Sequence, residues 1–178
     1  MEPFIAIRET MIEKPAIVPK GYHTLLRGLS RKVQLGLLLS LKILSAGKRR
    51  KGSRILNADG SIGHVEVQLS DSVILLFDHQ KGWPDTPAFL RVYVESAESV
   101  MKKAKDAGST IVTDVTLLFF GEKVGRIQDP WGNFWWIHER TEVISWPEME
   151  KSMHDPKEIE RMRYVQKSLD LALRRQNE

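Results

Sequence analysis

The stretch Gly121–Glu139, GEKVGRIQDPWGNFWWIHE, decides the fold of this 178-residue chain. At its centre, residues 129–132, the proline fixes φ at a turn position, the aspartate can bond back to the backbone, and the glycine tolerates a positive φ. The flanking runs 123–128 and 133–138 have the composition of short strands. The stretch therefore predicts an antiparallel β-hairpin.

The second strand of this hairpin carries an aromatic cluster, Phe134, Trp135 and Trp136. Successive side chains of a strand point to opposite faces of the sheet, so large rings lie on both faces. One face must meet the core, and the other is free to line a cavity.

Three further elements are predicted upstream of the hairpin. Residues 88–94 are rich in β-branched and aromatic types and predict a strand, and residues 110–116 predict another. Between them, small and apolar residues recur at helical spacing from Ala97 to Ala107, and Gly108 is placed to end that helix. The result is a β-α-β-β-β unit from about 88 to 138.

The end of this unit has an earlier counterpart in the chain. Residues 62–65 parallel residues 124–127 at a spacing of 62, and residues 73–77 correspond to the aromatic strand. Asp71-Ser72 occupies the place of the turn between them. Two copies of one module are therefore predicted.

The chain resembles the vicinal oxygen chelate superfamily, the group of glyoxalases, bleomycin-resistance proteins and extradiol dioxygenases, whose last hairpin commonly carries an Asp-Pro-x-Gly-Asn turn like residues 129–133. The run Ile62-Gly63-His64-Val65-Glu66-Val67 (62–67) also resembles its PhnB-like branch. The resemblance implies an α+β fold in which two β-α-β-β-β modules form curled mixed sheets around a cavity. It also implies modules that often pair across subunits, so a homodimer is expected.

We divide the chain accordingly. Residues 1–20, with three prolines, are expected to form an extended arm, and residues 21–140 the domain, with modules at about 21–78 and 88–139. Residues 141–178 are expected to be helical. In this last part Ser145 and Asp155 each have a glutamate three places on, a pattern that begins helices, and an apolar stripe follows in the second helix.

Composition fits a single domain of about 100–150 residues with extensions, with 42% hydrophobic and 28% charged residues. The absence of cysteine excludes disulfides, thiolate metal sites and cysteine nucleophiles. No signal peptide is recognised at the start, which favours a cytoplasmic protein. The apolar run 35–44 is far shorter than the roughly 20 residues needed to cross a bilayer.

The net charge of +4 arises in one segment. Residues 21–56 contain nine basic and no acidic residues, and the remainder has 18 basic and 23 acidic ones. Within this segment, residues 25–53 lack the strand and helix pattern that the resemblance implies. Three interpretations stay open: a divergent strand and helix, a stretch translated in a shifted reading frame, or an acquired function such as phosphate contact by residues 48–51.

The superfamily usually holds a divalent metal through histidine and glutamate, one ligand from each of four strands. The resemblance puts these positions at Leu75, Phe89 and Trp136, with the fourth near Leu26. None of the three readable side chains can bind a metal, so no metal ligand is assigned and no cofactor is expected. A divalent metal held elsewhere is the alternative, although the five histidines show no common ligand spacing.

His64 and Glu66 share one face of a predicted strand. They are weak candidates for a general base and its partner. The competing interpretation is two polar residues on a half-exposed strand or dimer edge.

A ligand pocket is predicted on the aromatic face of the second module. Alternation places six residues on that face: Phe89, Arg91, Tyr93, Phe134, Trp136 and His138. If the aliphatic face packs on the 97–107 helix, these side chains look into the cavity, with Arg91 as the one obvious charge. Such a pocket suits an aromatic or planar ligand, anionic if Arg91 contacts it. Alternatively, the rings simply fill the space.

The function that we predict is a cytoplasmic, small-molecule-binding protein of the glyoxalase and bleomycin-resistance type, without metal at the usual position. The first alternative is a metal-dependent lyase, isomerase or dioxygenase of the same superfamily. The second is a basic scaffold that binds nucleic acid through residues 27–54, which we consider the less favoured of the two. No membrane partner is expected.

Overall fold

The computed structural model describes residues 27–30, 48–49, 53–84 and 86–175. The arm at 1–20, the position near Leu26 and most of the unusual segment 25–53 lie outside these residues. The three interpretations of that segment, and nucleic-acid binding through it, therefore stay predictions.

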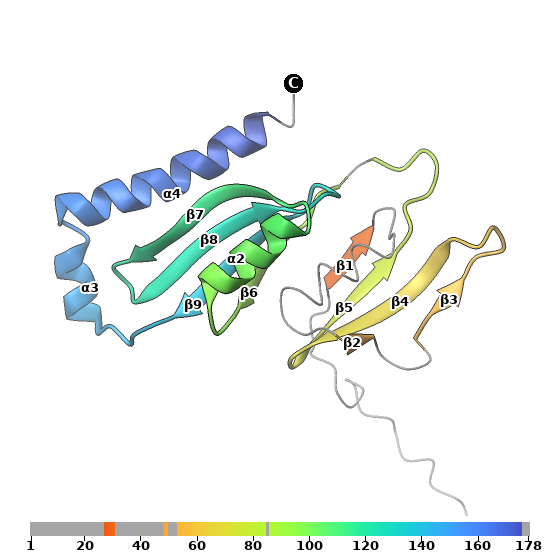
Figure 1. Cartoon of the computed structure of the whole chain (residues 1–178), viewed down its shortest axis with the longest axis horizontal. Helices are drawn as coiled ribbons and strands as arrows, with labels where there is room; N and C mark the ends of the chain where they lie inside the picture. The colour runs from red at the N-terminus through yellow and green to blue at the C-terminus, as the bar shows by residue number, and fades with distance from the viewer. Residues whose placement is uncertain (1–26, 31–47, 50–52, 85, 176–178) are drawn as a thin grey trace, which may run out of the picture.

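The described chain forms two mixed β-sheets, with helices beside the second (Figure 1). The first sheet has the order β1 (Arg27–Ser30), β5 (Ser72–Phe77), β4 (Ile62–Leu69) and β2 (Lys48–Arg49), and β3 (Ile55–Leu56) also pairs with β4. The second sheet has the order β6 (Phe89–Tyr93), β9 (Phe134–Arg140), β8 (Glu122–Gln128) and β7 (Thr110–Leu118). The helices are α2 (Ala97–Asp106), α3 (Trp146–Ser152) and α4 (Pro156–Arg174). The predicted α+β class is confirmed.

The two sheets repeat one pattern of strand pairing. In each, an antiparallel hairpin, β4–β5 or β8–β9, is joined by a parallel strand from the start of the module, β1 or β6. The predicted repeat is thus visible in the pairing. One detail differs, because the first hairpin turns at Ser70 and Asp71, and Ser72 already begins β5 opposite Leu69. Ser70 takes the positive φ of 50° in that two-residue turn.

The turn at residues 129–132 is held by one buried carboxylate. Asp129, 3% exposed, accepts hydrogen bonds from the backbone N–H groups of Trp131 and Asn133 and from the side chains of Asn133 and Trp135, all at 2.9 Å. Gly132 has the positive φ of 83° that the turn requires. The same carboxylate therefore fixes both the turn and the indole of Trp135.

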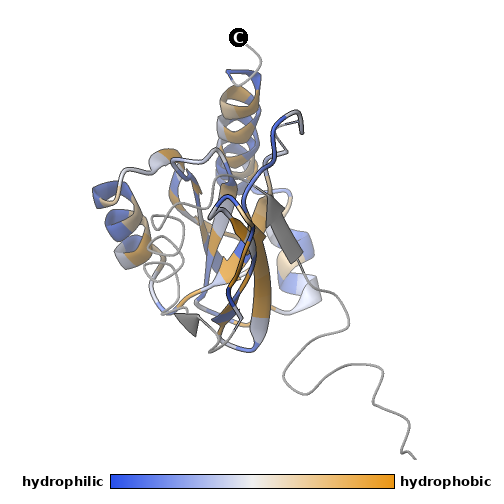
Figure 2. Cartoon of the chain, turned by 90° about the vertical axis from the view of Figure 1, so that its right-hand side faces the viewer, coloured by the Kyte–Doolittle hydropathy of each residue, from blue (hydrophilic) through white to orange (hydrophobic). Residues whose placement is uncertain are grey.

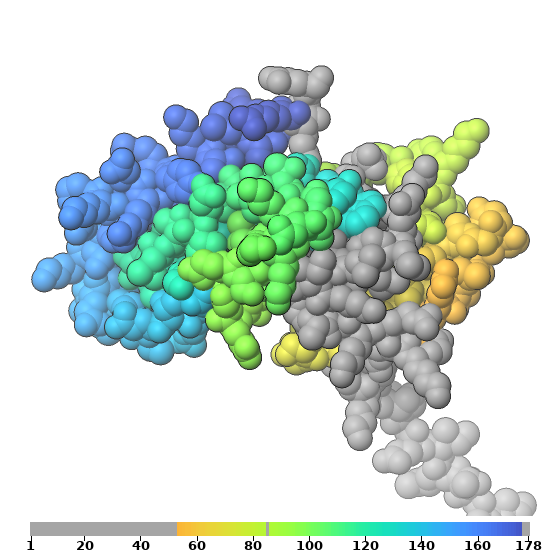
Figure 3. All heavy atoms as spheres, in the orientation of Figure 1, coloured from red at the N-terminus to blue at the C-terminus, as the bar shows by residue number. Residues whose placement is uncertain are grey.

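Helix α2 packs on the aliphatic face of the second sheet. Its residues Ala97, Val100, Met101 and Ala104 are buried in one cluster with Leu90, Ile127, Trp135 and Ile137 of the strands. The helix ends as predicted at Gly108, whose φ is +92°, while the amides of residues 108 and 109 bond back to Lys105 and Ala104. In Figure 3 this helix forms the front surface of the second module.

Six buried apolar residues of β4 and β5 belong to the same contiguous cluster as those under α2: Ile62, Val65, Val67, Leu69, Ile74 and Leu76. Along β4, Val65, Val67 and Leu69 are buried, while the residues between them are half-buried. The first sheet lies nearer the viewer in Figure 2, where its central strands are largely hydrophobic.

Helices α3 and α4 begin where the sequence predicts. Ser145 and Glu148 form a capping box, and Asp155 accepts the Lys157 amide at 2.8 Å. Helix α4 runs along β7 (Figure 1), and its Val165, 3% exposed, packs with Leu118 and Val124. No helix among the described residues is long and apolar enough to cross a membrane.

Candidate functional site

The face of the second sheet opposite α2 carries the six residues of the predicted pocket. The parallel register sets Phe89 opposite Phe134, Arg91 opposite Trp136, and Tyr93 opposite His138. The structure therefore brings all six side chains together on neighbouring strands, β6 and β9. Alternation along the two strands is the physical cause.

The aromatic rings form two levels. Phe89 stacks on Phe134 with ring centroids 5.3 Å apart and an interplanar angle of 8°, and its edge approaches Trp136 at 6.5 Å. Phe134 is fully buried, whereas Phe89 is 43% exposed. Phe134 thus supports the surface, and Phe89 forms it.

Two guanidinium groups approach the indole of Trp136. Arg91 lies 5.4 Å and Arg126 5.1 Å from the ring centroid, both in the range of cation–π contact. Arg126 belongs to β8 and stands directly opposite Trp136 in the hairpin. Neither arginine forms an ion pair with another described residue. Burial, and next the positive charge of Arg91, hold the pKa of Arg126 below its usual range.

Arg126 was not among the residues that the sequence analysis selected. Counting outward from the predicted turn 129–132 pairs residue 126 with residue 135, whereas the loop between the paired strands is one residue longer, 129–133, and this longer loop sets residue 126 opposite residue 136. This face of the sheet therefore carries two positive groups instead of the single one predicted. One of them, Arg126, is 9% exposed and the other, Arg91, is exposed.

Helix α4 covers the other half of this face. The Nη1 of Arg126 donates to the carbonyl oxygen of Val165 at 2.6 Å and to the hydroxyl of Thr113 at 3.3 Å, and that hydroxyl lies 2.7 Å from the Ser168 hydroxyl. The Nε of Arg126 and the indole N–H of Trp136 are buried and have no acceptor among the described residues. Buried donors of this kind are uncommon and cost free energy.

At the far end of β9, His138 is buried and its Nδ1 lies 2.7 Å from a carboxylate oxygen of Glu122. Tyr93, 58% exposed, covers its ring at 5.4 Å. Burial lowers the pKa of His138, the positive charges of Arg91 and Arg126 add to that, and Glu122 opposes it. On balance the lowered pKa favours the neutral imidazole beside this positive surface.

The exposed layer of the candidate site consists of Phe89, Arg91 and Tyr93, and the layer beneath it of Phe134, Trp136 and His138. The site is an aromatic surface with positive charge at its centre. It suits stacking with a planar ring and contact with an anionic group.

His64 and Glu66 lie on the other sheet. They occupy alternate positions of β4, as predicted, with Nε2 and Oε1 3.4 Å apart. His64 is 38% and Glu66 17% exposed at the side chain. No contact among the described residues joins this pair to Arg91 or Arg126 on the aromatic face of the second sheet. Its role as base and partner therefore stays a prediction.

The usual superfamily metal does not fit the side chains at the described positions. Leu75 and Phe89 have no ligand atom, and the indole nitrogen of Trp136 is a donor only. No group of three or more histidine, aspartate or glutamate side chains among the described residues could hold a metal ion.

Comparisons with solved structures identify the fold. Protein PA1353 from Pseudomonas aeruginosa superposes with a TM-score of 0.55 and 12% identity, covering 66% of this chain and 98% of that one. TioX from Micromonospora sp. ML1 gives 0.52 and 16%, with 65% and 96% covered. A glyoxalase/bleomycin resistance protein/dioxygenase family enzyme from Burkholderia phytofirmans PsJN gives 0.50 and 12%, with 65% and 96% covered. The chain has the vicinal oxygen chelate fold.

Sequence comparison adds distant relatives without a described activity. No family model matches the chain. An uncharacterized protein of Mycobacterium bovis is 21% identical over 111 residues, which are 56% of this chain and 73% of that protein. Two uncharacterized proteins of Mycobacterium tuberculosis match equally, and there the match spans 65% of each protein. At these identities the vicinal oxygen chelate likeness concerns the fold and leaves the activity open.

Proposed function

We propose that this protein binds a small, planar, anionic ligand on the β6–β9 half of the second sheet. In this proposal it acts as a glyoxalase/bleomycin-resistance-type binding protein, without a metal at the usual superfamily positions. The observation that carries the proposal is the pair of guanidinium groups on Trp136, which no described carboxylate neutralises. We further propose that it is a homodimer, which light scattering on the purified protein tests.

The chemistry of the face favours this ligand class for two reasons. Tyr93 is 58% exposed and offers a ring surface for stacking, and Phe89 beside it is 43% exposed. Arg91 is exposed beside them, and a guanidinium paired with a carboxylate gives a short, charge-assisted bond. The buried Arg126 adds positive potential at the same place without needing to move.

Calorimetric titration with 2-naphthoate, its neutral amide and cyclohexanecarboxylate tests the proposal. We expect 2-naphthoate to bind more tightly than either analogue, because the amide lacks the charge and the cyclohexane ring cannot stack. Arg91→Gln should weaken naphthoate binding at least about tenfold, since a hydrogen bond to a charged group contributes about 1.5–3 kcal/mol. Arg54→Gln, which removes an exposed charge from the first module, is the matched control and should leave the affinity unchanged.

Equal binding of the acid and its amide would contradict the proposal, and so would equal loss of affinity in both variants. Elemental analysis of protein purified without chelator tests whether the protein contains a divalent metal. Stoichiometric divalent metal in a cooperatively folded sample would favour the alternative, a lyase, isomerase or dioxygenase with ligands outside the described positions.

A further inference from the structure

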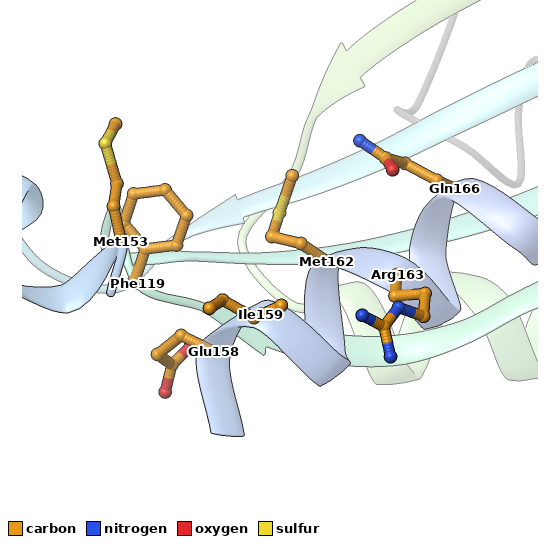
Figure 4. Close-up of a pocket in the computed structure, with 7 residues that line it drawn as sticks. All are labelled: Phe119, Met153, Glu158, Ile159, Met162, Arg163 and Gln166. Carbon is orange, nitrogen blue, oxygen red and sulfur yellow. The ribbon is translucent and has the colours of Figure 1, made fainter. Parts of the chain in front are cut away.

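A cavity lies at the start of α4 and shares no lining residue with the candidate site on β6 and β9. It has a volume of about 320 Å³ and lies where the α3–α4 junction and the first turns of α4 meet the end of β7 (Figure 4). Its wall is mainly apolar, formed by Phe119, Met153, Ile159 and Met162. Its polar groups include the carboxylate of Glu158 and the guanidinium of Arg163. The volume is at the lower end of the range for small-molecule sites.

Glu158 has an incompletely satisfied carboxylate. One oxygen accepts a hydrogen bond from Nη1 of Arg161 at 2.6 Å, while the other is buried and has no donor among the described residues. Glu158 occupies the third position of α4, where the helix dipole stabilises a negative charge. A buried carboxylate oxygen without a donor costs free energy, so the site is improved by any ligand that brings an N–H group.

The wall around this carboxylate is suited to a hydrocarbon group next to a cation. Phe119 offers an aromatic ring, which attracts ammonium groups, and the thioethers of Met153 and Met162 are soft and adapt to an irregular ligand. The terminal torsion of a glutamate has a broad energy minimum. Because Glu158 lines the cavity, rotation about this torsion is the movement that the proposal requires to present its free oxygen to a ligand.

Charge is distributed unevenly around the cavity. In Figure 4, Glu158 and Arg163 extend from different turns of α4, with Ile159 between them and Phe119 beside Met153. A cation is therefore attracted to the Glu158 end and repelled from the Arg163 end. This asymmetry fixes the orientation of the ligand and gives opposite expectations for the two charged residues.

We propose that this cavity binds a primary ammonium compound with a short aromatic or branched hydrocarbon arm. The ammonium group donates to the free oxygen of Glu158, and the arm lies against Phe119, Met153 and Met162. The site is separate from the aromatic face of the second sheet and selects the opposite charge. The proposal does not depend on the proposed function.

The test is calorimetric titration of the full chain with 2-phenylethylammonium, with 2-phenylethanol as the neutral analogue and 3-phenylpropanoate as the anionic one. We expect saturable binding of the ammonium compound only. Glu158→Gln should weaken it at least tenfold, whereas Glu160→Gln, two residues along the same helix and outside the cavity, should change it less than twofold. Arg163→Gln should leave the affinity equal or raise it.

Thermal melts of each variant establish that the proteins compared are folded. If Glu158→Gln does not fold, a second variant that narrows the cavity, Ile159→Trp, serves instead and should abolish binding. No saturable binding of 2-phenylethylammonium to the folded protein would overturn the proposal, and so would equal affinities in Glu158→Gln and Glu160→Gln. Binding of the alcohol as tightly as the amine would overturn the role of the carboxylate.

Discussion

The two faces of the second sheet differ in how completely the hydrogen-bond donors of their buried side chains find acceptors. Under α2, Leu90, Trp135 and Ile137 are buried in a contiguous core, and the indole N–H of Trp135 bonds to Asp129. On the opposite face, the indole of Trp136 has no acceptor among the described residues and lies between two arginines. Neighbouring residues of β9 thus differ in role. Trp135 stabilises the core on one face, whereas Trp136 on the other face has a donor and a ring surface that a ligand could use, a pattern expected at functional sites.

The largest expected effect is on the core side. Asp129→Ala leaves four N–H donors without their carboxylate, three of them on the buried residues Asn133 and Trp135 and one on the half-buried Trp131. We expect the free energy of unfolding to fall by about 3–5 kcal/mol, because buried hydrogen bonds to a charged group are lost together. Urea unfolding measures this. A loss below about 1 kcal/mol would show that water replaces the carboxylate and that the turn is less closed than the structure indicates.

An intermediate effect is expected at Gly125, where the sheet meets α2. A Cβ at this position would lie 2.9 Å from the sulfur of Met101, which is 5% exposed. Gly125→Ala should therefore cost about 1–3 kcal/mol through overpacking. Adding Met101→Ala should recover part of the loss, so the double variant should be more stable than the sum of the single ones predicts. Strict additivity of the two would contradict the contact.

A smaller change is expected on the other face from Arg126→Met. The variant loses the hydrogen bond to the Val165 carbonyl but also removes a buried charge that no described residue neutralises. These effects oppose each other, so we expect the free energy of unfolding to change by less than about 1 kcal/mol. Amide hydrogen exchange in α4 should become faster around residue 165, since the helix loses its link to β8. A loss above about 3 kcal/mol would make Arg126 a core residue like those under α2.

The smallest stability effect is expected from Arg91→Gln, because the side chain is exposed and forms no ion pair with a described residue. We expect less than about 0.5 kcal/mol. Its electrostatic effect is measurable on His138, whose pKa should rise in the variant because Arg91 helps to lower it. NMR titration of the imidazole checks the direction, and Arg54→Gln is the control.

The lowered pKa of His138 also sets the sign of a pH effect on stability. In the unfolded chain this residue takes up a proton near its ordinary value of about 6.5, and in the folded protein only at lower pH. Its contribution is therefore fully present above that ordinary value and decreases as the pH falls toward the folded value. Arg91→Gln should reduce this acid sensitivity.

Much of the second module follows from the sequence because its signals are local. The turn at 129–132, the helix end at Gly108 and the caps at Ser145 and Asp155 each depend on a few neighbouring residues, and all are found where predicted. Alternation also assigns the residues of the aromatic face correctly to one side.

Which residues of that face are buried and which are exposed could not be predicted in the same way. Alternation places Phe134 and Phe89 together, but only the packing of one ring on the other makes the first buried and the second exposed. The contact between Arg126 and α4 joins residues 39 positions apart, and no local pattern specifies it. The apolar stripe of α4 could not by itself distinguish packing on the domain from packing on a second subunit, and the contact of Val165 with Leu118 and Val124 shows packing on the domain.

Each module closes by the parallel pairing of its first strand with its last, as Phe89 with Phe134 and Arg27 with Ile74 show. The contact order of such a pair is high, because more than forty residues separate the partners, and the entropy of closing that loop precedes any gain. During synthesis on the ribosome, β6 therefore lacks its partner in the second sheet until the aromatic strand β9 has emerged. The WGNFWWIHE run would complete the module as a folding unit as well as line its binding face.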